Sequence, residues 1–324
     1  MGRPPIGRWN PAASITARML APAPIFALVL SLTVTPPLQS QLREHGPVIL
    51  QLPASTSAMA MGGAFQLTGG RSDAIFYNPS ILAGAAGFGL DGQTFDSKSN
   101  LLTLSAVTDW WRGAVGVGLQ ALSYSTDAHS GQDVHRGETD LLTGGAFGST
   151  EFVATVGYAQ EIAGLDWGIA AKNIEHRLGG DKDVALAVDL GVSVEVGDFR
   201  LGLAAQNLGS DLRLGGASVD LAQRVTLGAS GNGWQVGPFD LGASAALSQE
   251  ADGTMVPALG GEIEYWPVRG RTFTGWVGVR RVDDGPAHSM TFGAAFHGDA
   301  LGIEYAYQGF ESFGDAHRLG ISWR

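Results

Sequence analysis

The feature that most constrains the fold of this chain is a long series of segments in which apolar residues alternate with small or polar ones. Valine or leucine occupies every even position of residues 184–196, whereas Asp189, Ser193 and Glu195 lie between them. Alternation with a period of two places successive side chains on opposite faces of a β-strand. Comparable segments continue from about residue 86 to the C-terminus. The sequence therefore predicts an all-β protein whose strands have one apolar and one polar face.

Three properties favour a membrane-spanning barrel over a soluble β-sandwich, in which the polar face would point outward. The segments are about 9–13 residues long, which suits a tilted transmembrane strand better than an ordinary strand. Their apolar stripes often begin or end with an aromatic residue, as an interfacial girdle requires. An export-like leader precedes a chain without cysteine. We therefore predict a transmembrane antiparallel β-barrel of about 14 strands over residues 86–324.

The connections between segments suggest how the barrel is oriented. The segments number about fifteen, the fourth at residues 136–149 and the fifth at 151–163. Bacterial barrels have an even number of strands, so one segment is expected to be split or to lie outside the wall. Tight connections such as Gly197-Asp198 and Gly298-Asp299 predict periplasmic hairpins, and the polar residues 127–136 and 283–287 predict extracellular loops. Residues 209–222, the longest interruption, are expected to fold over one mouth of the barrel.

Residues 1–40 have the composition of an export signal. Three arginines precede an apolar core at residues 24–34, and two prolines end it. We expect a signal peptide that is removed after Ser40. A single membrane anchor is the alternative, although the core is short for a spanning helix. Residues 41–85 then form an N-terminal segment in front of the barrel.

Residues 55–86 resemble neither the leader nor the strands. Small residues, including Gly62 and Gly63, allow this backbone to pack closely against another backbone. Asp73 precedes an apolar run at a position where a helix cap is favoured, and we expect it to accept hydrogen bonds from backbone or arginine donors. Asn78-Pro79 ends the run, because proline cannot extend the preceding element. The pattern predicts a short helix, a sharp corner and then the first strand.

Composition excludes several classes of function. A net charge of −11 without a basic stripe argues against nucleic-acid binding. The absence of cysteine rules out disulfides and thiolate metal sites. His129 and His135 are interpreted as part of a solvated loop, because their spacing does not suggest a metal site. Neither a G-x-S-x-G elbow nor a P-loop occurs. We expect no catalytic residues, no metal and no cofactor.

Charged residues on the polar face of the predicted strands are candidates for the lining of the lumen. They carry both signs, whereas a selective ion path would favour rings of one sign. We therefore expect a salt-bridged lumen that holds an N-terminal plug. The candidates are Arg112, Lys172, Glu195, Arg200, Glu262, Glu264, Arg280, Glu304 and Arg318.

The motif AMGGAF, followed by DA and then by YNPS and LA, resembles the N-terminal signature of the PorV/PorQ family. That family is related to FadL-type transporters of hydrophobic compounds. Ser80 stands where the signature usually has alanine. Further stretches recur in the same order, including GIAAK at 168–172, QNLG at 206–209 and EYAY at 304–307. The resemblance implies a fourteen-stranded outer-membrane barrel with an internal N-terminal segment.

The same resemblance implies a non-enzymatic role in type IX protein secretion, where such barrels bind cargo or partner proteins at the cell surface. A FadL-like transporter of hydrophobic small molecules is the alternative, and a structural or adhesive surface barrel is a third. The expected partners are outer-membrane lipids, the barrel-assembly machinery and, in the export role, secreted cargo or other secretion-system proteins.

Overall fold

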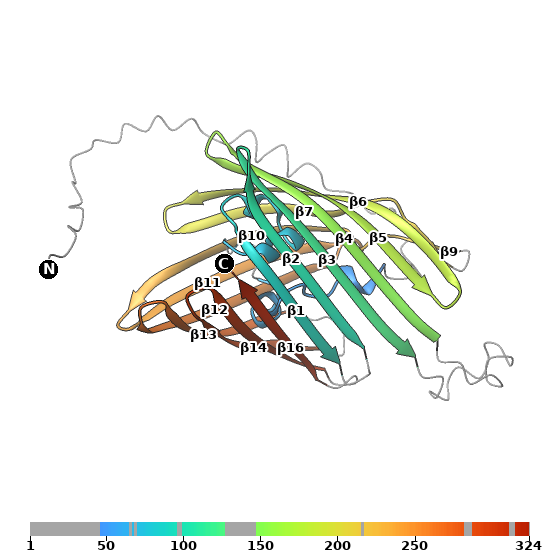
Figure 1. Cartoon of the computed structure of the whole chain (residues 1–324). Helices are drawn as coiled ribbons and strands as arrows, with labels where there is room; N and C mark the ends of the chain where they lie inside the picture. Colours follow the sequence, from blue (N-terminus) through green and yellow to red (C-terminus); the bar gives the residue numbers. More distant parts are fainter. Residues whose placement is uncertain are drawn as a thin grey trace. The chain divides into compact units, whose positions relative to one another are not determined.

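A computed structural model describes residues 46–64, 67, 70–95, 99–126, 147–214, 217–281, 287–310 and 315–323 (Figure 1). The expected signal peptide, the polar loop at 127–136 and His129 and His135 lie outside these residues. Among the residues described, no helix is long and apolar enough to cross a membrane.

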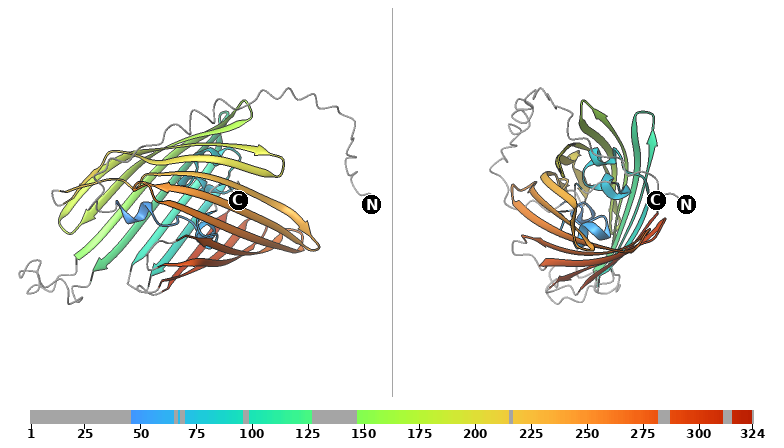
Figure 2. Two further views of the ribbon diagram at one scale, coloured as in Figure 1. Left: turned by 180° about the vertical axis from the view of Figure 1, so that it is seen from behind. Right: turned by 90° about the vertical axis from the view of Figure 1, so that its left-hand side faces the viewer.

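Fourteen antiparallel strands close into a single barrel, as the sequence predicted (Figures 1 and 2). Each strand pairs with its neighbour in the chain, except that β7 pairs with β10 and β16 closes the barrel on β1. The strands of the wall are β1 (Gly87–Phe95), β2 (Asn100–Trp110), β3 (Gly113–Thr126), β4 (Phe147–Ile162), β5 (Leu165–Leu178), β6 (Asp181–Val196), β7 (Phe199–Gly209), β10 (Arg224–Val236), β11 (Phe239–Glu250), β12 (Met255–Val268), β13 (Arg271–Arg280), β14 (Ala287–His297), β15 (Leu301–Phe310) and β16 (Ala316–Trp323).

Two expectations about the segments are now resolved. The predicted boundary between the fourth and fifth segments, at residue 150, lies inside a single strand, because β4 is continuous over residues 147–162. Without this boundary the predicted segments correspond to the fourteen strands of the wall. The long interruption at 209–222 contains a separate hairpin, β8 (Leu212–Leu214) paired with β9 (Ala217–Val219). Leu212 is fully buried against the wall, so the hairpin folds over a mouth of the barrel as expected.

The outer face of the barrel is apolar. Along β6 the even-numbered valines and leucines point outward, and Leu186 is 66% exposed. Burying one such side chain is worth about 1.5–3 kcal/mol, so a belt of them around every strand requires a hydrocarbon environment. Aromatic side chains gather at one end of the belt, as expected for an interfacial girdle: Phe88, Trp110, Trp111, Trp167, Phe199, Phe239, Tyr265, Trp266, Phe273, Phe296 and Trp323.

The two ends of the barrel differ in their connections. At the aromatic end, turns of two or three residues join consecutive strands, for example Gly197-Asp198 between β6 and β7. Gly197 has a φ of +62°, a left-handed conformation that glycine adopts without strain. Most connections at the opposite end are longer, including the one that carries β8 and β9, although two residues suffice between β5 and β6. We call these the short-turn end and the long-loop end; in bacterial barrels they face the periplasm and the exterior, respectively.

The N-terminal segment lies inside the barrel, where its short helices are surrounded by strands (Figure 2, right). We call residues 46–86 the plug. It contains η1 (Val48–Leu50), α2 (Thr56–Ala60), η2 (Ser72–Phe76) and η3 (Pro79–Leu82). Nearly all residues of the three later helices are buried. The plug begins at the long-loop end, where η1 packs on β3 and β4, and joins β1 at the short-turn end.

Glycines on the inner face of the wall let the plug approach the strands closely. A Cβ atom added to Gly168 would lie 2.2 Å from the carbonyl carbon of Pro79, and one on Gly278 would lie 2.2 Å from the amide nitrogen of Gly62. The inner glycines that face plug atoms in this way are Gly89, Gly116, Gly118, Gly157, Gly168, Gly191, Gly202, Gly228, Gly260, Gly278, Gly293 and Gly320. They account for part of the high glycine content of the chain, 48 of 324 residues.

The close approach at Gly168 leads to a testable expectation. Gly168→Ala should destabilise the folded barrel by about 1–3 kcal/mol, because an overpacked interior must shift. The temperature at which the heat-modifiable gel band converts to the unfolded band would measure this loss. Gly92→Ala is the matched control on β1, since a Cβ there meets no atom within 4 Å. Equal conversion temperatures for the two variants would contradict the proposed contact.

Candidate functional site: the plugged lumen

Arg318 anchors the first part of the plug to the wall. It is the largest fully buried side chain among the described residues and projects inward from β16. Its guanidinium donates hydrogen bonds to two plug carbonyls, those of Pro53 (2.5 Å) and Ala54. It also donates to Gln93 Oε1 (2.9 Å) and Thr103 Oγ1 (3.1 Å) on the wall. One fixed cation therefore determines where the chain enters α2.

A wall carboxylate secures the beginning of α2 itself. Asp91 Oδ1 on β1 accepts hydrogen bonds from the backbone amide of Thr56 (2.8 Å) and from its hydroxyl (2.6 Å). Arg318 Nε lies 3.8 Å from the same oxygen. The first four amides of a helix lack partners within the helix, so Asp91 satisfies one of them and places negative charge at the positive end of the helix dipole.

A second anchor joins the middle of the plug to β15. Arg71 donates to both oxygens of Glu304, at 2.7 and 3.1 Å, which is a bidentate ion pair between buried groups. Arg71 Nε also lies 3.3 Å from Asp73 Oδ1. His297 Nε2 is 3.4 Å from Glu304 Oε1. Removing one member of such a buried pair typically costs about 3–5 kcal/mol, because the other charge is left unpaired.

Asp73 does not occupy the cap position that the sequence suggested. The residue that precedes η2 is Arg71, which makes no side-chain cap, and Asp73 lies within the first turn. The carboxylate turns instead toward Arg71, because a buried charge requires an opposite one nearby. Its second oxygen, Oδ2, has no hydrogen-bond partner in the described part of the chain. The predicted arginine contact is present, whereas the predicted cap is not.

Neutral hydrogen bonds close the plug on itself and on the wall. The Tyr77 hydroxyl accepts from the amides of Ala54 and Ser55, both at 2.8 Å. Burial raises the pKa of Tyr77 above its ordinary value, so the hydroxyl keeps its proton. Gln206 Nε2 on β7 donates to the carbonyl of Phe76 (2.8 Å), and Thr291 Oγ1 on β14 donates to that of Ala60 (2.9 Å).

The Asn78-Pro79 pair forms the corner between η2 and η3. Asn78 Oδ1 accepts from the amide (3.1 Å) and the hydroxyl (2.8 Å) of Ser80, and Pro79 is the first residue of η3. Ser80 Oγ contacts Ser193 Oγ on β6 at 3.0 Å. Serine at the third position of the motif, in place of alanine, thus adds a polar contact with the wall.

A β-bulge creates a polar group that the sequence analysis did not identify as a site. Gln206 and Asn207 on β7 together oppose Asp189 on β6, and Asn207 has a φ of +59°. The bulge turns both consecutive side chains inward. Lys172 lies 2.7 Å from Asp189 Oδ2 and donates to Asn207 Oδ1 (2.7 Å), and Asn207 Nδ2 donates to the carbonyl of Ala222 (2.7 Å). Gln206 and Asn207 are adjacent polar residues within an alternating strand, and this break in the alternation is the sequence signal for the bulge.

The structure separates the sequence-predicted lumen residues into several groups. Lys172, Glu304 and Arg318 are buried at the plug. Glu262 and Glu264 are half-buried on β12, and Glu262 accepts from Trp276 Nε1 at 2.6 Å. Arg280 ends β13 at the long-loop end, and Arg200 pairs with Glu195 at the short-turn end.

Arg112 lies in the exposed turn between β2 and β3 and not on a strand, and its guanidinium is 5.7 Å from the Trp111 ring. Strand alternation does not extend into a two-residue turn. Of the proposed plug motif, Gly62 lies against β13, and no atom lies within 4 Å of a Cβ built on Gly63.

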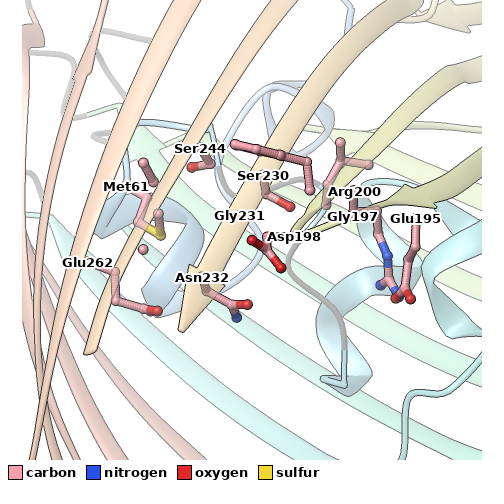
Figure 3. A pocket seen from close by; sticks show the side chains of 14 residues that line it. Met61, Glu195, Gly197, Asp198, Arg200, Ser230, Gly231, Asn232, Ser244 and Glu262 are labelled. Atoms are coloured by element: carbon pink, nitrogen blue, oxygen red, sulfur yellow. The ribbon is translucent and has the colours of Figure 1, made fainter. Parts of the chain in front are cut away.

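Two cavities lie beneath the plug at the short-turn end. One of about 340 Å³ is bounded by Met61 and Leu67 of the plug and by polar wall residues that include Ser244 and Glu262 (Figure 3). The other, of about 730 Å³, is lined by Ala83 and Gly84 of the plug and by Asp109, Arg112, Glu161 and Asp166. Within the part of the chain that is described, no set of side chains could hold a metal ion.

The anchor at Arg318 predicts a measurable change. Arg318→Met should destabilise the barrel by about 3–5 kcal/mol, because it leaves two plug carbonyls and Asp91 without their cation. It should also raise the mean single-channel conductance in planar bilayers as the plug detaches. Arg177→Met is the control, because its ion pair with Glu175 lies at the surface and contributes little to stability. A conductance indistinguishable from that of the control would show that Arg318 does not hold the plug.

No protein-family model and no curated protein matches this sequence. Several solved structures nevertheless resemble it. The CymD monoaromatic hydrocarbon channel has a TM-score of 0.59 at 12% identity, over 83% of this chain and 96% of that one. The toluene transporter TodX of Pseudomonas putida has a TM-score of 0.56 at 14% identity, over 87% and 98%. A FadL homologue of Pseudomonas aeruginosa has a TM-score of 0.51 at 10% identity, over 84% and 98%.

At these identities the likeness shows the fold alone: the chain shares the barrel architecture of these channels. The comparisons do not extend to the finer resemblance to PorV and PorQ. The described geometry is that of a fourteen-stranded barrel whose lumen holds its own N-terminal segment.

Proposed function

We propose that the protein is an outer-membrane channel for hydrophobic small molecules and that the plug is its gate in the closed position. The apolar outer belt supports a membrane location, and short turns at one end with longer loops at the other are typical of the outer membrane. Similar folds occur in channels described as carrying monoaromatic hydrocarbons and toluene. We expect outer-membrane lipids to cover the belt and the barrel-assembly machinery to insert it.

The observation that carries this proposal is a continuous series of buried apolar contacts inside a lumen whose wall is otherwise mostly small or polar. Barrels that conduct water and ions have polar lumens. Here one buried apolar cluster joins the plug to the wall, and a second lies at the long-loop end. Phe95 packs against both clusters, so the apolar contacts are continuous from the mouth to the plug. Such an interior favours apolar molecules, which gain free energy when they leave water.

The comparisons support the transport hypothesis better than the protein-export hypothesis. The similar solved structures described above are a channel, a transporter and a FadL homologue. The export role that the PorV/PorQ resemblance implies depends on cargo or partner proteins at the cell surface, and no described contact favours it. We therefore propose transport as the function.

Transport through the lumen requires the plug to move, which a reversible cross-link can test. Ser72 Oγ of the plug lies 2.7 Å from Ser105 Oγ of β2, so cysteines at both positions are close enough to form a disulfide. The chain has no native cysteine to interfere. With Ser72→Cys and Ser105→Cys combined, uptake of radiolabelled toluene by intact cells should fall to the background level when oxidised and recover after reduction.

The Ser72→Cys single variant is the control for oxidation itself and should transport equally in both conditions. Unchanged uptake by the oxidised double variant, with the disulfide verified by mass spectrometry, would show that plug movement is not needed. Uptake no higher than that of cells lacking the protein would contradict the channel function.

A further inference from the structure

We infer that the apolar cluster at the long-loop end is a ligand site, which the chain's own η1 occupies in the closed state. We further infer that the ligand is an apolar molecule that carries a hydrogen-bond donor, such as a hydroxyl group, and not a carboxylate. This inference rests on the proposed function and specifies the class of molecule that the mouth of the channel binds most tightly. We call the site the mouth site; its wall residues are Leu101, Leu122, Val153 and Ile174.

Four adjacent strands each contribute one large aliphatic side chain to the mouth site. Leu101 on β2 pairs with Leu122 on β3, and Val153 on β4 pairs with Ile174 on β5. All four point inward and are buried. Most other buried inward-facing side chains of the wall are small or polar, as in Ala170, Ser193 and Thr226. The aliphatic surface is therefore a local departure from the composition of the lumen.

A segment of the chain itself covers this aliphatic surface. Ile49 of η1 is fully buried in the cluster, and Leu212 and Leu221, from the connection between β7 and β10, cover it further. η1 has only three residues and packs on β3 and β4 with few contacts. So short a helix has little stability of its own, because helix nucleation is unfavourable. An apolar ligand of similar size can therefore compete with Ile49 for the same surface.

A buried carboxylate at the edge of the mouth site indicates what the ligand must donate. Glu151 is fully buried, and its Oε2 accepts from the amide of Ile49 at 2.7 Å while Oε1 accepts from that of Val48 at 3.2 Å. Tyr124 donates to Oε1 at 3.0 Å, and His176 Nε2 lies 3.6 Å from it. When η1 leaves, Oε2 loses its donor inside an apolar surround, which is costly. A ligand hydroxyl would restore that hydrogen bond.

A carboxylate ligand is disfavoured at the mouth site. It would face Glu151, a like charge that repels it. The buried cations Lys172 and Arg318 are already engaged, by Asp189 and by the plug carbonyls, respectively. His176 Nδ1 is buried without a hydrogen-bond partner among the described residues and can form a further hydrogen bond with a ligand hydroxyl. The site therefore favours a neutral donor over an anion.

The test compares two probes of equal chain length, 1-decanol and decanoate, at neutral pH with the barrel in nanodiscs. Affinity would be measured by titration, and hydrogen–deuterium exchange of the peptide covering residues 46–52 would report whether η1 is displaced. We expect decanol to bind at least about tenfold more tightly than decanoate, since hydrogen bonds to charged groups and like-charge repulsion both contribute to this preference. Exchange in residues 46–52 should accelerate when decanol binds.

Two variants separate the proposed roles from a general loss of folding. Glu151→Gln keeps an acceptor oxygen but removes the charge, so decanol and decanoate should bind within about threefold of each other. Ile49→Ala weakens the internal competitor and should strengthen decanol binding several-fold, a gain that a folding defect would not produce. Val48→Ala is its matched control, because Val48 is 43% exposed and should leave the affinity unchanged.

The outcomes distinguish the site from the channel function. Decanoate binding as tightly as decanol to the wild-type barrel would overturn the proposed chemistry, and decanol binding without faster exchange in residues 46–52 would overturn the location. Either result is compatible with toluene uptake by the same barrel and leaves the channel proposal intact. Loss of decanol binding together with absence of toluene uptake would remove both proposals.

Discussion

The structure depends on one steric constraint: a folded segment of about forty residues must fit inside a barrel of fourteen strands. Side chains of ordinary size on both surfaces would not leave room for it. The wall therefore presents glycine where the plug passes, and at Gly191 a Cβ would fall 2.0 Å from Asn78 Oδ1. Backbone contact replaces side-chain packing, so the position of the plug is fixed by shape as well as by hydrogen bonds.

This close fit explains the distribution of charge. Buried ions are tolerated only with partners, and Arg318, Arg71 and Lys172 each meet carbonyl or carboxylate oxygens. The first two bind plug to wall, whereas Lys172 stabilises the bulge at Asn207. Mixed charges in the lumen thus serve attachment and do not form an ion path. A plug held by a few separate polar anchors, with cavities beneath it, is suited to the gating role proposed above.

Much of this architecture is determined by local sequence patterns. A period of two is a property of single strands, so the wall, its apolar outer face and the aromatic ends could be predicted residue by residue. The corner at Asn78-Pro79 could also be predicted, because proline restricts its own neighbourhood. The sequence analysis placed a boundary between two segments at residue 150, inside β4, because a short polar stretch within a strand resembles a turn.

Only the tertiary structure decided which inward residues meet. The sequence predicted that Glu304 and Arg318 face the lumen, but it could not predict which plug residues they contact. Glu304 pairs with Arg71 and Arg318 binds the carbonyl of Pro53, and contacts between positions more than 200 residues apart leave no periodic signal. The sequence placed Arg112 on a strand, whereas this residue lies in the turn between β2 and β3, since alternation does not reveal where a turn begins. In the folded barrel β16 lies beside β1, and four aliphatic side chains of the wall surround Ile49. These tertiary contacts determine what the lumen can bind.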